Sequence, residues 1–529
     1  MIDCLIIGFN DTNFEDYVTL AKSMGSDSGA FNDLDLAFIE HEGRPYRALD
    51  ALSHFANGNK QGNHYHNAEF MWPVVLYLGS YLTKRGFTFD YVNLFHLEKE
   101  KLKEKLAQDV LSVAITTTLY VSPAPILEII SFIKQHNEKV KIIVGGPYID
   151  NQAKLASPKA LQQVFKYIGA DFYVISAEGE ASLVKILEAL KAGAGFDAIE
   201  NIAYPQGRGF VLTKKAAESN SLAENMVDYT LFPREEFGEF VSLRTAKSCP
   251  FACSFCAFPD RAGAYQYLDV ACVEAELNHI RDIGGITTLT FLDDTFNVPK
   301  ARFKEILRMM IKNNYGFKWN SFYRSDQGDA EAIDLMAQAG CEGVFLGIES
   351  GSDTILKNMN KTAKRKHYLE AIPLLKQAGI TAHGNIIIGF PGETTSTVQE
   401  TIDFIEEAQP DYFRAQLWYA DPTTPIWHRR EEFGVKGSAF NWSHSTMDYQ
   451  TACDWIGKMF VSITGSTWLP QFGFEDWSLY YLRRKGMSRE QIKSFIHSFN
   501  AIIKNKVISP DDREAPPHLL NDLRSNCSF

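Results

Sequence analysis

The chain of 529 residues has no long hydrophobic run and no excess of basic residues. No uninterrupted apolar stretch reaches the length needed to span a bilayer. Asp and Glu total 65 against 53 for Lys and Arg, so the net charge is −12 and no generally basic surface is available for a nucleic-acid backbone. The first residues, Met1–Gly8, lack the basic segment of a signal peptide and are predicted as a strand. We therefore expect a cytoplasmic protein that binds neither nucleic acid nor a membrane.

Cysteine is scarce, and its distribution excludes a disulfide framework. Five of the eight cysteines are scattered singly, which is not the pattern of a disulfide-stabilised domain: Cys4, Cys272, Cys341, Cys453 and Cys527. The other three, Cys249, Cys253 and Cys256, lie within eight residues. This cluster is the most informative feature of the sequence.

The length predicts roughly three domains, and the first of these alternates strand and helix signals. Residues 1–213 are predicted to be a doubly wound, Rossmann-like α/β domain, followed by a linker at 214–239. An insertion rich in Asn, His and Gly is predicted at Asn57–Asn67, and a hairpin at Asn201–Thr213. The predicted strands are Cys4–Phe9, Thr88–Leu94, Leu111–Leu119, Val140–Gly145 and Phe172–Ser176, and the predicted helices are Trp72–Arg85, Glu98–Gln108, Pro125–His136, Pro158–Ile168 and Ala181–Ala192.

A second series of strands and helices covers residues 240–425. Six units in this length predict a partial (β/α)6 barrel, since a full eight-fold barrel typically takes about 250 residues. Its predicted strands are Val241–Ala246, Thr288–Leu292, Lys318–Phe322, Gly343–Ile348, Ile380–Ile388 and Tyr412–Tyr419. Residues 426–529 are predicted to be a mostly helical segment that covers the active site.

The three clustered cysteines have Cys-x3-Cys-x2-Cys spacing directly after a predicted strand. Such a loop can bring three thiolates to an iron–sulfur cluster and leave one iron open to a small chelating molecule. The alternative is a zinc site with a distant fourth ligand, but zinc sites usually have paired cysteine knuckles and no second knuckle is present. The spacing favours the iron–sulfur cluster.

The cysteine motif and four later motifs together resemble the radical S-adenosylmethionine (SAM) superfamily. The later motifs follow the second to fifth barrel strands, where barrel active sites lie: Phe291-Leu-Asp-Asp294-Thr-Phe296, Arg324-Ser-Asp326, Gly347-Ile-Glu349-Ser350-Gly351 and Gly389-Phe-Pro-Gly-Glu393. The resemblance implies that Cys249, Cys253 and Cys256 bind a [4Fe-4S] cluster whose open iron holds SAM. It also implies SAM contacts from Phe255, Asp294, Arg324, Glu349, Ser350 and Ile388.

Structural roles remain open for several of these residues. Arg324 and Glu349 could form a structural ion pair, and Phe255 could belong to the core. The sequence does not separate Asp293 from Asp294 as the residue that faces the site.

Three strand ends in the first domain are rich in glycine or hydroxyl groups, and open α/β sheets bind ligands at such ends. They contain Thr116, Thr117, Thr118 and Leu119; Gly145, Gly146 and Pro147; and Ser176, Glu178, Gly179 and Glu180. Ordinary turn chemistry explains each of them singly. Together, before a radical SAM barrel, they resemble the cobalamin-binding domains of cobalamin-dependent radical SAM enzymes. The Asp-x-His-x-x-Gly motif is absent, which implies cobalamin without a histidine ligand (His-off), and His64 and His66 are expected on a loop surface.

The resemblance covers about residues 1–419 and implies a cobalamin-dependent radical SAM methyltransferase. Such an enzyme moves a methyl group from SAM, through methylcobalamin, to an unactivated C–H or P–H centre of a small-molecule substrate. A low-potential electron donor, flavodoxin or ferredoxin, is implied as a partner. The alternatives are a cobalamin-binding radical SAM cyclase or oxidoreductase without methyl transfer, and a non-enzymatic corrinoid carrier.

Some segments, such as Asn67–Pro73 and Trp442–Met447, are similar to the phosphinothricin P-methylase branch. This similarity implies a small anionic acceptor, with a phosphinate as the first candidate. Arg414 and Lys247 are the candidate cations for it. The aromatic residues of the C-terminal segment are expected in the core more often than in a pocket: Trp418, Tyr419, Trp427 and Trp442, with His444 beside them.

Overall fold

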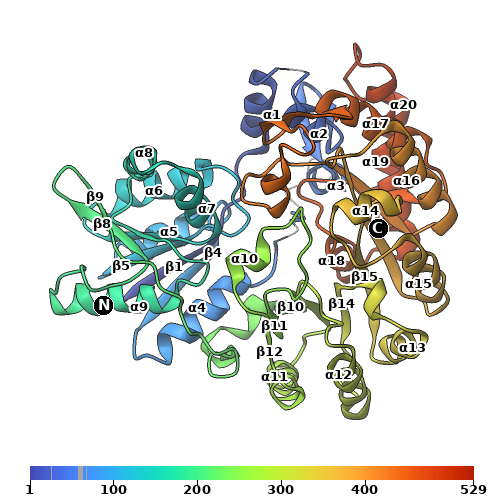
Figure 1. Cartoon of the computed structure of the whole chain (residues 1–529). Helices are drawn as coiled ribbons and strands as arrows, with labels where there is room; N and C mark the ends of the chain where they lie inside the picture. The colour runs from blue at the N-terminus through green and yellow to red at the C-terminus, as the bar shows by residue number, and fades with distance from the viewer. Residues whose placement is uncertain (26, 57–63, 67) are drawn as a thin grey trace.

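The computed structural model describes residues 1–25, 27–56, 64–66 and 68–529. Most of the predicted insertion at Asn57–Asn67 lies outside these ranges. Two seven-stranded sheets with their helices lie side by side in the chain (Figure 1). In the described ranges no helix has both the length and the apolar character to cross a bilayer. The predicted α/β class, with a doubly wound domain followed by a partial barrel, is confirmed.

The first sheet has the order β4-β1-β5-β6-β7-β8-β9. The strands β4 (Phe89–Leu94), β1 (Cys4–Phe9), β5 (Ser112–Thr116), β6 (Lys141–Gly145) and β7 (Phe172–Val174) are parallel, and the hairpin β8 (Ile202–Gln206) and β9 (Gly209–Leu212) extends them antiparallel. The strand order switches sides at β1: the chain adds β4 on one side of β1 and then adds β5 on the other. Doubly wound sheets bind ligands at such a switch point, here between β1 and β5. Its helices are α4 (Pro73–Thr83), α5 (Lys99–Leu106), α6 (Ala124–His136), α7 (Pro147–Leu155), α8 (Pro158–Ile168) and α9 (Glu180–Ala192), of which the sequence predicts all but α7.

Between β1 and β4 the chain leaves the first sheet and packs against the C-terminal segment. This excursion contains α1 (Phe14–Ser23), α2 (Gly29–Asp35), β2 (Phe38–His41), β3 (Arg44–Arg47) and α3 (Ala48–Ala56). The buried Lys506 Nζ donates to the backbone oxygens of Asp35 at 2.6 Å and Phe38 at 2.9 Å, and lies 3.1 Å from Asp35 Oδ1. Ala515 N donates to Glu40 O at 2.9 Å. The sequence does not predict these contacts, because no local pattern shows that the two ends of the chain meet.

The second sheet is parallel throughout and has the order β10-β13-β14-β15-β16-β17-β21. Its strands are β10 (Phe240–Leu243), β13 (Thr288–Phe291), β14 (Lys318–Phe322), β15 (Cys341–Glu349), β16 (Thr381–Ile388), β17 (Tyr412–Leu417) and β21 (Thr467–Trp468). The outer helices are α11 (Val270–Ile283), α12 (Lys300–Asn313), α13 (Ala330–Gln338), α15 (Arg365–Gln377) and α16 (Thr395–Ala408). The predicted six-strand barrel is therefore present, and the C-terminal segment adds a short seventh strand to it.

The first barrel strand is shorter than predicted. β10 ends at Leu243, and β11 (Ala246–Lys247) pairs antiparallel with β12 (Gln266–Tyr267) in a separate sheet. The carboxylate of Asp293 accepts hydrogen bonds from Thr245 N at 2.6 Å and Ala246 N at 2.8 Å. These two N–H groups are therefore not available to a continued barrel strand.

Residues 426–529 are mostly helical, as predicted. They contain β18 (Lys436–Ser438), β19 (Asn441–His444), β20 (Met447–Asp448), α17 (Tyr449–Ser462), α18 (Ser478–Arg484), α19 (Arg489–Ile508) and α20 (Pro517–Asn526). Two short helices complete the barrel side, α10 (Phe258–Ala262) and α14 (Asp353–Asn358). The predicted linker is docked on the first domain, because Glu218 accepts hydrogen bonds from Ala181 N at 2.8 Å and Ser182 N at 3.0 Å at the start of α9.

We expect Lys506→Met to lower the thermal midpoint of unfolding by a few degrees. The substitution removes a buried ammonium that bonds two backbone oxygens and a carboxylate, a loss of about 3 kcal/mol. Differential scanning calorimetry measures the midpoint. The control is Lys493→Met, an exposed lysine on the same helix. Equal midpoints for the two variants would show that the contact between the chain ends does not stabilise the fold.

Candidate active site

The three clustered cysteines line one pocket at the carboxyl ends of the barrel strands. The pocket has a volume of about 320 Å³, and its walls come from the cysteine loop (residues 248–257) and from the ends of β13, β14, β15 and β16. The motifs predicted separately from the sequence thus converge on one site. The lining residues are Cys249, Phe251, Cys253, Phe255, Cys256, Phe258, Pro259, Asp294, Thr295, Phe322, Tyr323, Arg324, Phe345, Gly347, Glu349, Lys361, Tyr368 and Asn385.

The cysteine loop is held in place by the segment that follows α14. Ser254 donates from its N–H to Met359 O and from its hydroxyl to Asn358 O, both at 2.8 Å. Asn360 Nδ2 donates to Ala252 O at 2.7 Å. The position of the loop is therefore set by the fourth strand–helix unit of the barrel as well as by the strand that precedes it.

The three thiols differ in exposure: Cys253 is buried, whereas Cys249 and Cys256 are half-buried. Burial raises the pKa of the Cys249 thiol and raises that of Cys256 to about 11. Both thiols are therefore protonated at neutral pH unless a metal centre stabilises the thiolate. Across the described residues, no set of three or more His, Cys, Asp or Glu side chains is arranged to hold a single metal ion. Three cysteines on the wall of one pocket are a donor set that fits an iron–sulfur cluster.

The structure separates the roles of Asp293 and Asp294. Asp293 is buried, and its carboxylate accepts hydrogen bonds from the turn at Thr245 and Ala246. Asp294 lines the pocket. The surrounding protein desolvates its carboxyl group and, together with the charge of Asp293, raises the pKa of Asp294 to about 7. Asp294 is thus the member of the pair whose side chain can contact a ligand in the pocket.

Arg324 and Glu349 both reach the pocket, but they do not pair with each other. Arg324 Nε lies 3.1 Å from Asp326 Oδ1, and its guanidinium carbon lies 3.5 Å from the centre of the Phe251 ring. Glu349 Oε1 lies 3.0 Å from Lys361 Nζ. The alternative of a structural Arg324–Glu349 ion pair is therefore wrong, and each group is instead oriented by its own counter-ion.

The backbone at Glu349 is strained, and the Glu349 side chain lines the pocket. Its φ angle is 66°, a conformation that residues other than glycine rarely adopt, and the register between β15 and β16 shifts between Gly347 and Glu349. A bulge of this kind re-aims a side chain. Here it coincides with the carboxylate that lines the pocket, which indicates a functional position.

Two residues predicted to contact SAM have buried side chains that are not part of the pocket wall. The Ser350 hydroxyl lies 3.2 Å from Thr401 Oγ1 and accepts from Ser352 N at 3.1 Å, and Ile388 is fully buried in β16. Four polar residues that line the pocket lie outside the motifs predicted from the sequence: Tyr323, Lys361, Tyr368 and Asn385. Of these, Asn385 carried a usable signal, since it is a polar residue within an apolar strand.

The aromatic residues of the C-terminal segment pack as a core, as expected. Trp442 and Trp418 are buried with their rings 5.1 Å apart, and the Trp442 and His444 rings are stacked at 5.4 Å. They lie behind the Gly389-Phe-Pro-Gly-Glu turn, where a Cβ on Gly389 would come within 2.3 Å of the Trp442 ring. Tyr419 differs, because it is 51% exposed and packs against Phe440.

The three glycine-rich or hydroxyl-rich turns of the first domain are neighbours at the ends of β5, β6 and β7. Thr117 donates through its N–H and its hydroxyl to Gly145 O, both at 3.0 Å, and Thr116 Oγ1 donates to Gly8 O at 2.8 Å. A Cβ on Gly146, whose φ is 111°, would meet Thr117 Oγ1 at 2.8 Å. The contacts of the turns themselves therefore require glycine at Gly146, whatever ligand binds there.

The remaining turn residues differ in what they contact. Gly179 lies against Val174, where a Cβ would approach to 2.7 Å. Leu119 has a φ of 68° and is 62% exposed. Thr118 and Ser176 are half-buried, and Pro147 begins α7. Glu180 begins α9, and burial raises the pKa of its carboxyl group.

Both candidate cations for an anionic substrate have carboxylate partners. Lys247, two residues before Cys249, forms an ion pair with Glu178 of the first domain. Arg414 is buried and lies 3.0 Å from Asp476 Oδ1. The Glu178–Lys247 pair joins the third turn of the first domain to the start of the cysteine loop.

A second cavity, of about 970 Å³, opens at the ends of β1 and β5 and is lined by Asp11, His66, His96, Leu119 and Tyr120 among others. The expectation of a surface position holds for His64, which is exposed, and is wrong for His66, which is 5% exposed. His66 Nε2 lies 3.1 Å from Asp11 Oδ2, and its Nδ1 accepts from Ala68 N at 3.1 Å. The acceptor carboxylate, which the sequence did not link to this histidine, explains the burial.

Comparisons with known proteins agree with this geometry. Residues 243–405 match the family model of the radical SAM superfamily. The chain is 26% identical over 362 residues to an uncharacterized methyltransferase of Pyrococcus horikoshii, covering 66% of this chain and 75% of that protein. It is 24% identical over 377 residues to the anaerobic magnesium-protoporphyrin IX monomethyl ester cyclase of Cereibacter sphaeroides, covering 67% and 60%. The fold is similar to that of the radical S-adenosylmethionine methyltransferase TsrM from Kitasatospora setae with cobalamin and a [4Fe-4S] cluster bound, with a TM-score of 0.61 and 16% identity over 86% of this chain and 96% of that one.

We expect ionisation of the buried Glu393 carboxyl group to lower the stability of the protein as the pH rises. Glu393→Gln should remove this pH dependence. Burial raises the pKa of Glu393 from 4.5 to about 8. Between these values the folded chain keeps a proton that the unfolded chain has released, so folding is increasingly disfavoured as pH rises. The variant keeps an acceptor for Gly389 N–H but cannot ionise.

Thermal midpoints measured from pH 5 to pH 9 test this expectation. The midpoints of wild type and Glu393→Gln should coincide at the acid end, and the variant should be the more stable protein at the alkaline end. Glu370→Gln, at an exposed position on α15, is the control for charge removal. A constant difference between wild type and Glu393→Gln at all pH values would contradict the expected ionisation.

Proposed function

We propose that the chain, whose residues 243–405 form a radical SAM domain, is a cobalamin-dependent radical SAM methyltransferase that acts on a small molecule. One observation carries the proposal. Cys249, Cys253 and Cys256 line a single pocket with the side chains of Asp294, Arg324 and Glu349 at the carboxyl ends of the barrel strands. The Glu178–Lys247 ion pair, which connects the third turn of the first domain to the start of the cysteine loop, supports the proposal.

In this proposal the three cysteines hold a [4Fe-4S] cluster and leave its fourth iron for SAM. With both bound, the site supplies a carbon radical able to take hydrogen from an unactivated substrate bond, and cobalamin supplies the methyl group. Glu349, oriented by Lys361, and Asp294 would accept hydrogen bonds from the amino and hydroxyl groups of SAM. Arg324, oriented by Asp326, would face the carboxylate of SAM. Phe255 would lie beside the adenine.

Two members of the expected SAM contacts would act differently from the others. Ser350 and Ile388 have buried side chains, so they would contribute through their backbone groups. The pocket is lined by several aromatic rings, among them Phe251, Phe255 and Phe322. Such a wall excludes water from a reactive radical, which is a main task of the protein in cofactor-based radical chemistry.

Cobalamin would be held by the turns at residues 116–119, 145–147 and 176–180. Two histidines near the ends of β1 and β4 could be considered as cobalt ligands, but each already accepts a backbone hydrogen bond at Nδ1, while the buried Nε2 of His96 has no partner among the described residues. His66 Nδ1 accepts from Ala68 N while Nε2 faces Asp11, and His96 Nδ1 accepts from Asp11 N at 3.1 Å, which leaves its Nε2 as the protonated nitrogen. These hydrogen bonds support cobalamin without a protein imidazole on cobalt.

The methyl acceptor is proposed to be a small molecule, with a phosphinate P–H centre as the first candidate and an unactivated carbon as the second. The first candidate rests on the resemblance of the sequence segments given above. Because Lys247 and Arg414 have carboxylate partners, a phosphinate would need to displace Glu178 from Lys247 to be neutralised there. An external low-potential donor such as flavodoxin or ferredoxin would supply the electron.

The proposed domain limits are 1–213, 240–425 and 426–529, with a linker at 214–239.

A cyclase or oxidoreductase without methyl transfer is the second candidate function. The similarity to the anaerobic cyclase of Cereibacter sphaeroides favours it. The mass of the product separates the two candidates, because methyl transfer adds one methylene unit to the substrate and releases S-adenosylhomocysteine, whereas cyclisation does neither.

We expect Cys253→Ala to abolish both cluster assembly and the formation of 5′-deoxyadenosine from SAM. Removing one of three thiolate ligands exposes the cluster to loss, and the pocket offers no replacement sulfur among its lining residues. Iron and labile sulfide analysis and chromatography of the nucleoside product measure the two effects after anaerobic reconstitution. The control is Cys272→Ala, a half-buried cysteine on α11 away from the pocket. Retention of SAM cleavage in Cys253→Ala would overturn the assignment of the cluster site.

We expect wild type to methylate N-acetyl-demethylphosphinothricin when supplied with SAM, methylcobalamin and a low-potential reductant. Phosphorus NMR follows the reaction, because the large P–H splitting of the substrate disappears when phosphorus becomes methylated. Persistence of the P–H doublet while 5′-deoxyadenosine accumulates would exclude the phosphinate. The methyltransferase would then need a carbon acceptor, and the product mass remains the test of methyl transfer itself.

A further inference from the structure

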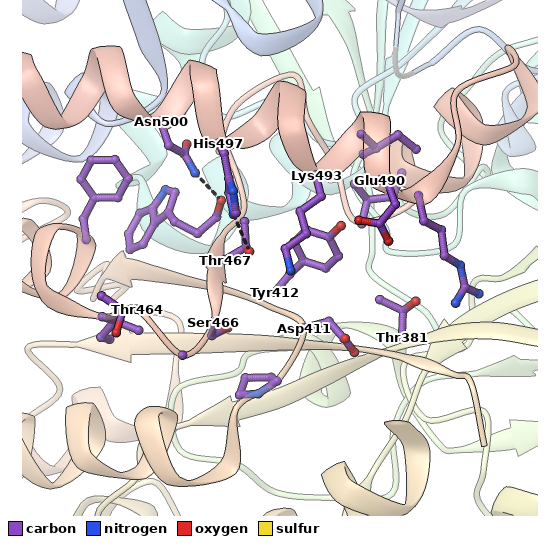
Figure 2. Close-up of a pocket in the computed structure, with 18 of the residues that line it drawn as sticks. Thr381, Asp411, Tyr412, Thr464, Ser466, Thr467, Glu490, Lys493, His497 and Asn500 are labelled. Carbon is purple, nitrogen blue, oxygen red and sulfur yellow. Dashed lines mark hydrogen bonds between the residues drawn. The ribbon is translucent and has the colours of Figure 1, made fainter. Parts of the chain in front are cut away.

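A cavity of about 630 Å³ lies at the end of the barrel opposite to the cysteine pocket (Figure 2). Its floor is formed by the starts of β16 at Thr381, β17 at Tyr412 and β21 at Thr467, and its roof is α19. Thr381 begins the strand that carries Asn385 into the cysteine pocket, and four residues of strand span about 13 Å. The two cavities therefore share a strand but not a wall.

The polar face of α19 points into this cavity. Residues at spacings of three and four lie on one face of a helix, and five lining residues of α19 have this spacing: Glu490, Lys493, His497, Asn500 and Lys504. Figure 2 shows the labelled members of this set directed toward the strand starts below them. The face of α19 that carries Phe495, Phe499 and Ile502 is buried, whereas Lys493 and His497 are exposed, so the cavity between the helix and the sheet is open to solvent.

Three buried polar atoms on residues of the cavity wall have no hydrogen-bond partner among the described residues: Ser466 Oγ, Trp468 Nε1 and Asn500 Oδ1. The residues are 9%, 3% and 5% exposed. Their neighbours are satisfied, since Asn500 Nδ2 donates to Trp468 O at 2.8 Å and His497 Nε2 lies 3.0 Å from Thr467 Oγ1. Because buried polar groups in native proteins nearly always have partners, these three groups call for a polar ligand or water.

The cavity wall carries more cations than carboxylates, with Lys376, Arg483, Arg489, Lys493 and Lys504 against Asp411 and Glu490. Lys493 is exposed and pairs with none of the described residues, and Lys504 Nζ lies 5.6 Å from the centre of the Phe460 ring. Burial and the charges of Lys493 and Lys504 lower the pKa of His497. Of the two lining carboxylates, Asp411 already accepts from Ala382 N at 2.9 Å. This local excess of cations stands out on a chain with a net charge of −12.

We propose that this cavity is a binding site for a small, multiply charged oxyanion that bears phosphate or carboxylate groups. Lys493 and Lys504 would neutralise its charge, and Ser466 and Trp468 would donate hydrogen bonds to its oxygens. Asn500 Oδ1 would accept from a hydroxyl group of the same ligand. The volume is within the range of small-molecule sites. Since the site is at the far end of the barrel from the cysteines, its ligand is distinct from the methyl acceptor, and the proposal does not depend on the proposed function.

Isothermal titration calorimetry of the full chain with pyrophosphate, inorganic phosphate and citrate, at constant ionic strength, tests the proposal. We expect one saturable site for at least one probe, and the stronger of the phosphate and citrate arms identifies the charged group that the site prefers. Lys493→Gln should weaken binding about tenfold, as expected for the loss of a charge-assisted hydrogen bond. Lys312→Gln, which removes an exposed lysine on α12, should leave the affinity unchanged.

A second variant keeps the test independent of the lysine. Trp468→Phe removes the unpartnered indole N–H but keeps an aromatic ring, and it should also weaken binding, with an unchanged circular dichroism spectrum as evidence of folding. Absence of saturable binding of all three probes to folded wild type would overturn the proposal. Binding of equal affinity in wild type, Lys493→Gln and Trp468→Phe would place the anion elsewhere and would also overturn it.

Discussion

The buried carboxylate of Asp293 determines the path of the chain from the first barrel strand into the cysteine loop. It accepts hydrogen bonds from Thr245 N, Thr245 Oγ1 and Ala246 N at 2.5 to 2.8 Å, and Arg302 Nη2 donates to Thr245 Oγ1 at 2.8 Å. A buried charge is tolerated only with such a set of partners, so these residues form one unit. The unit ends β10, starts the separate pairing of β11 and positions the three cysteines. It also leaves the next residue, Asp294, on the pocket wall.

The first domain is tied to the barrel close to this unit. Arg244 N donates to Tyr77 OH at 3.0 Å, and its guanidinium carbon lies 4.7 Å from the centre of the Tyr77 ring. In the linker between them, Tyr229 OH donates to Glu276 Oε1 of the barrel at 2.9 Å, and burial raises the pKa of Glu276 to about 7. Polar groups that are buried between domains specify a single arrangement, because any other arrangement leaves them unpaired. A reaction that needs a substrate between two cofactors depends on such a fixed arrangement.

Features that repeat along the chain could be predicted from the sequence. The strand and helix series gave both domains, and the placement of motifs after strands correctly predicted that Cys249, Asp294, Arg324 and Glu349 meet. Features that depend on distant partners could not be predicted. The sequence predicted Lys247 and Arg414 as cations for an anionic substrate, but in the structure they pair with Glu178 and Asp476. His66 looked like a loop residue because Asp11, its partner, is 55 residues away in the sequence. The local sequence shows which residues are apolar or charged. Only the folded structure shows which charged side chains are already paired and which are free to bind a ligand.

The contact of the N-terminal excursion with α19 and the residues after it has a consequence for how the protein is made. The excursion is made early, yet the surface that covers α2 and β2 includes Lys506 and Ala515, of which Lys506 lies 471 residues after Asp35. A ribosome adds roughly 5 to 20 residues per second, so the early segment waits tens of seconds with its apolar side uncovered. The barrel and the first sheet can form during this interval, whereas the excursion can dock only once α19 and the residues after it have been made. Docking of the excursion is thus a late step of folding, and until α19 has been made the apolar side of the excursion has no partner surface to cover it.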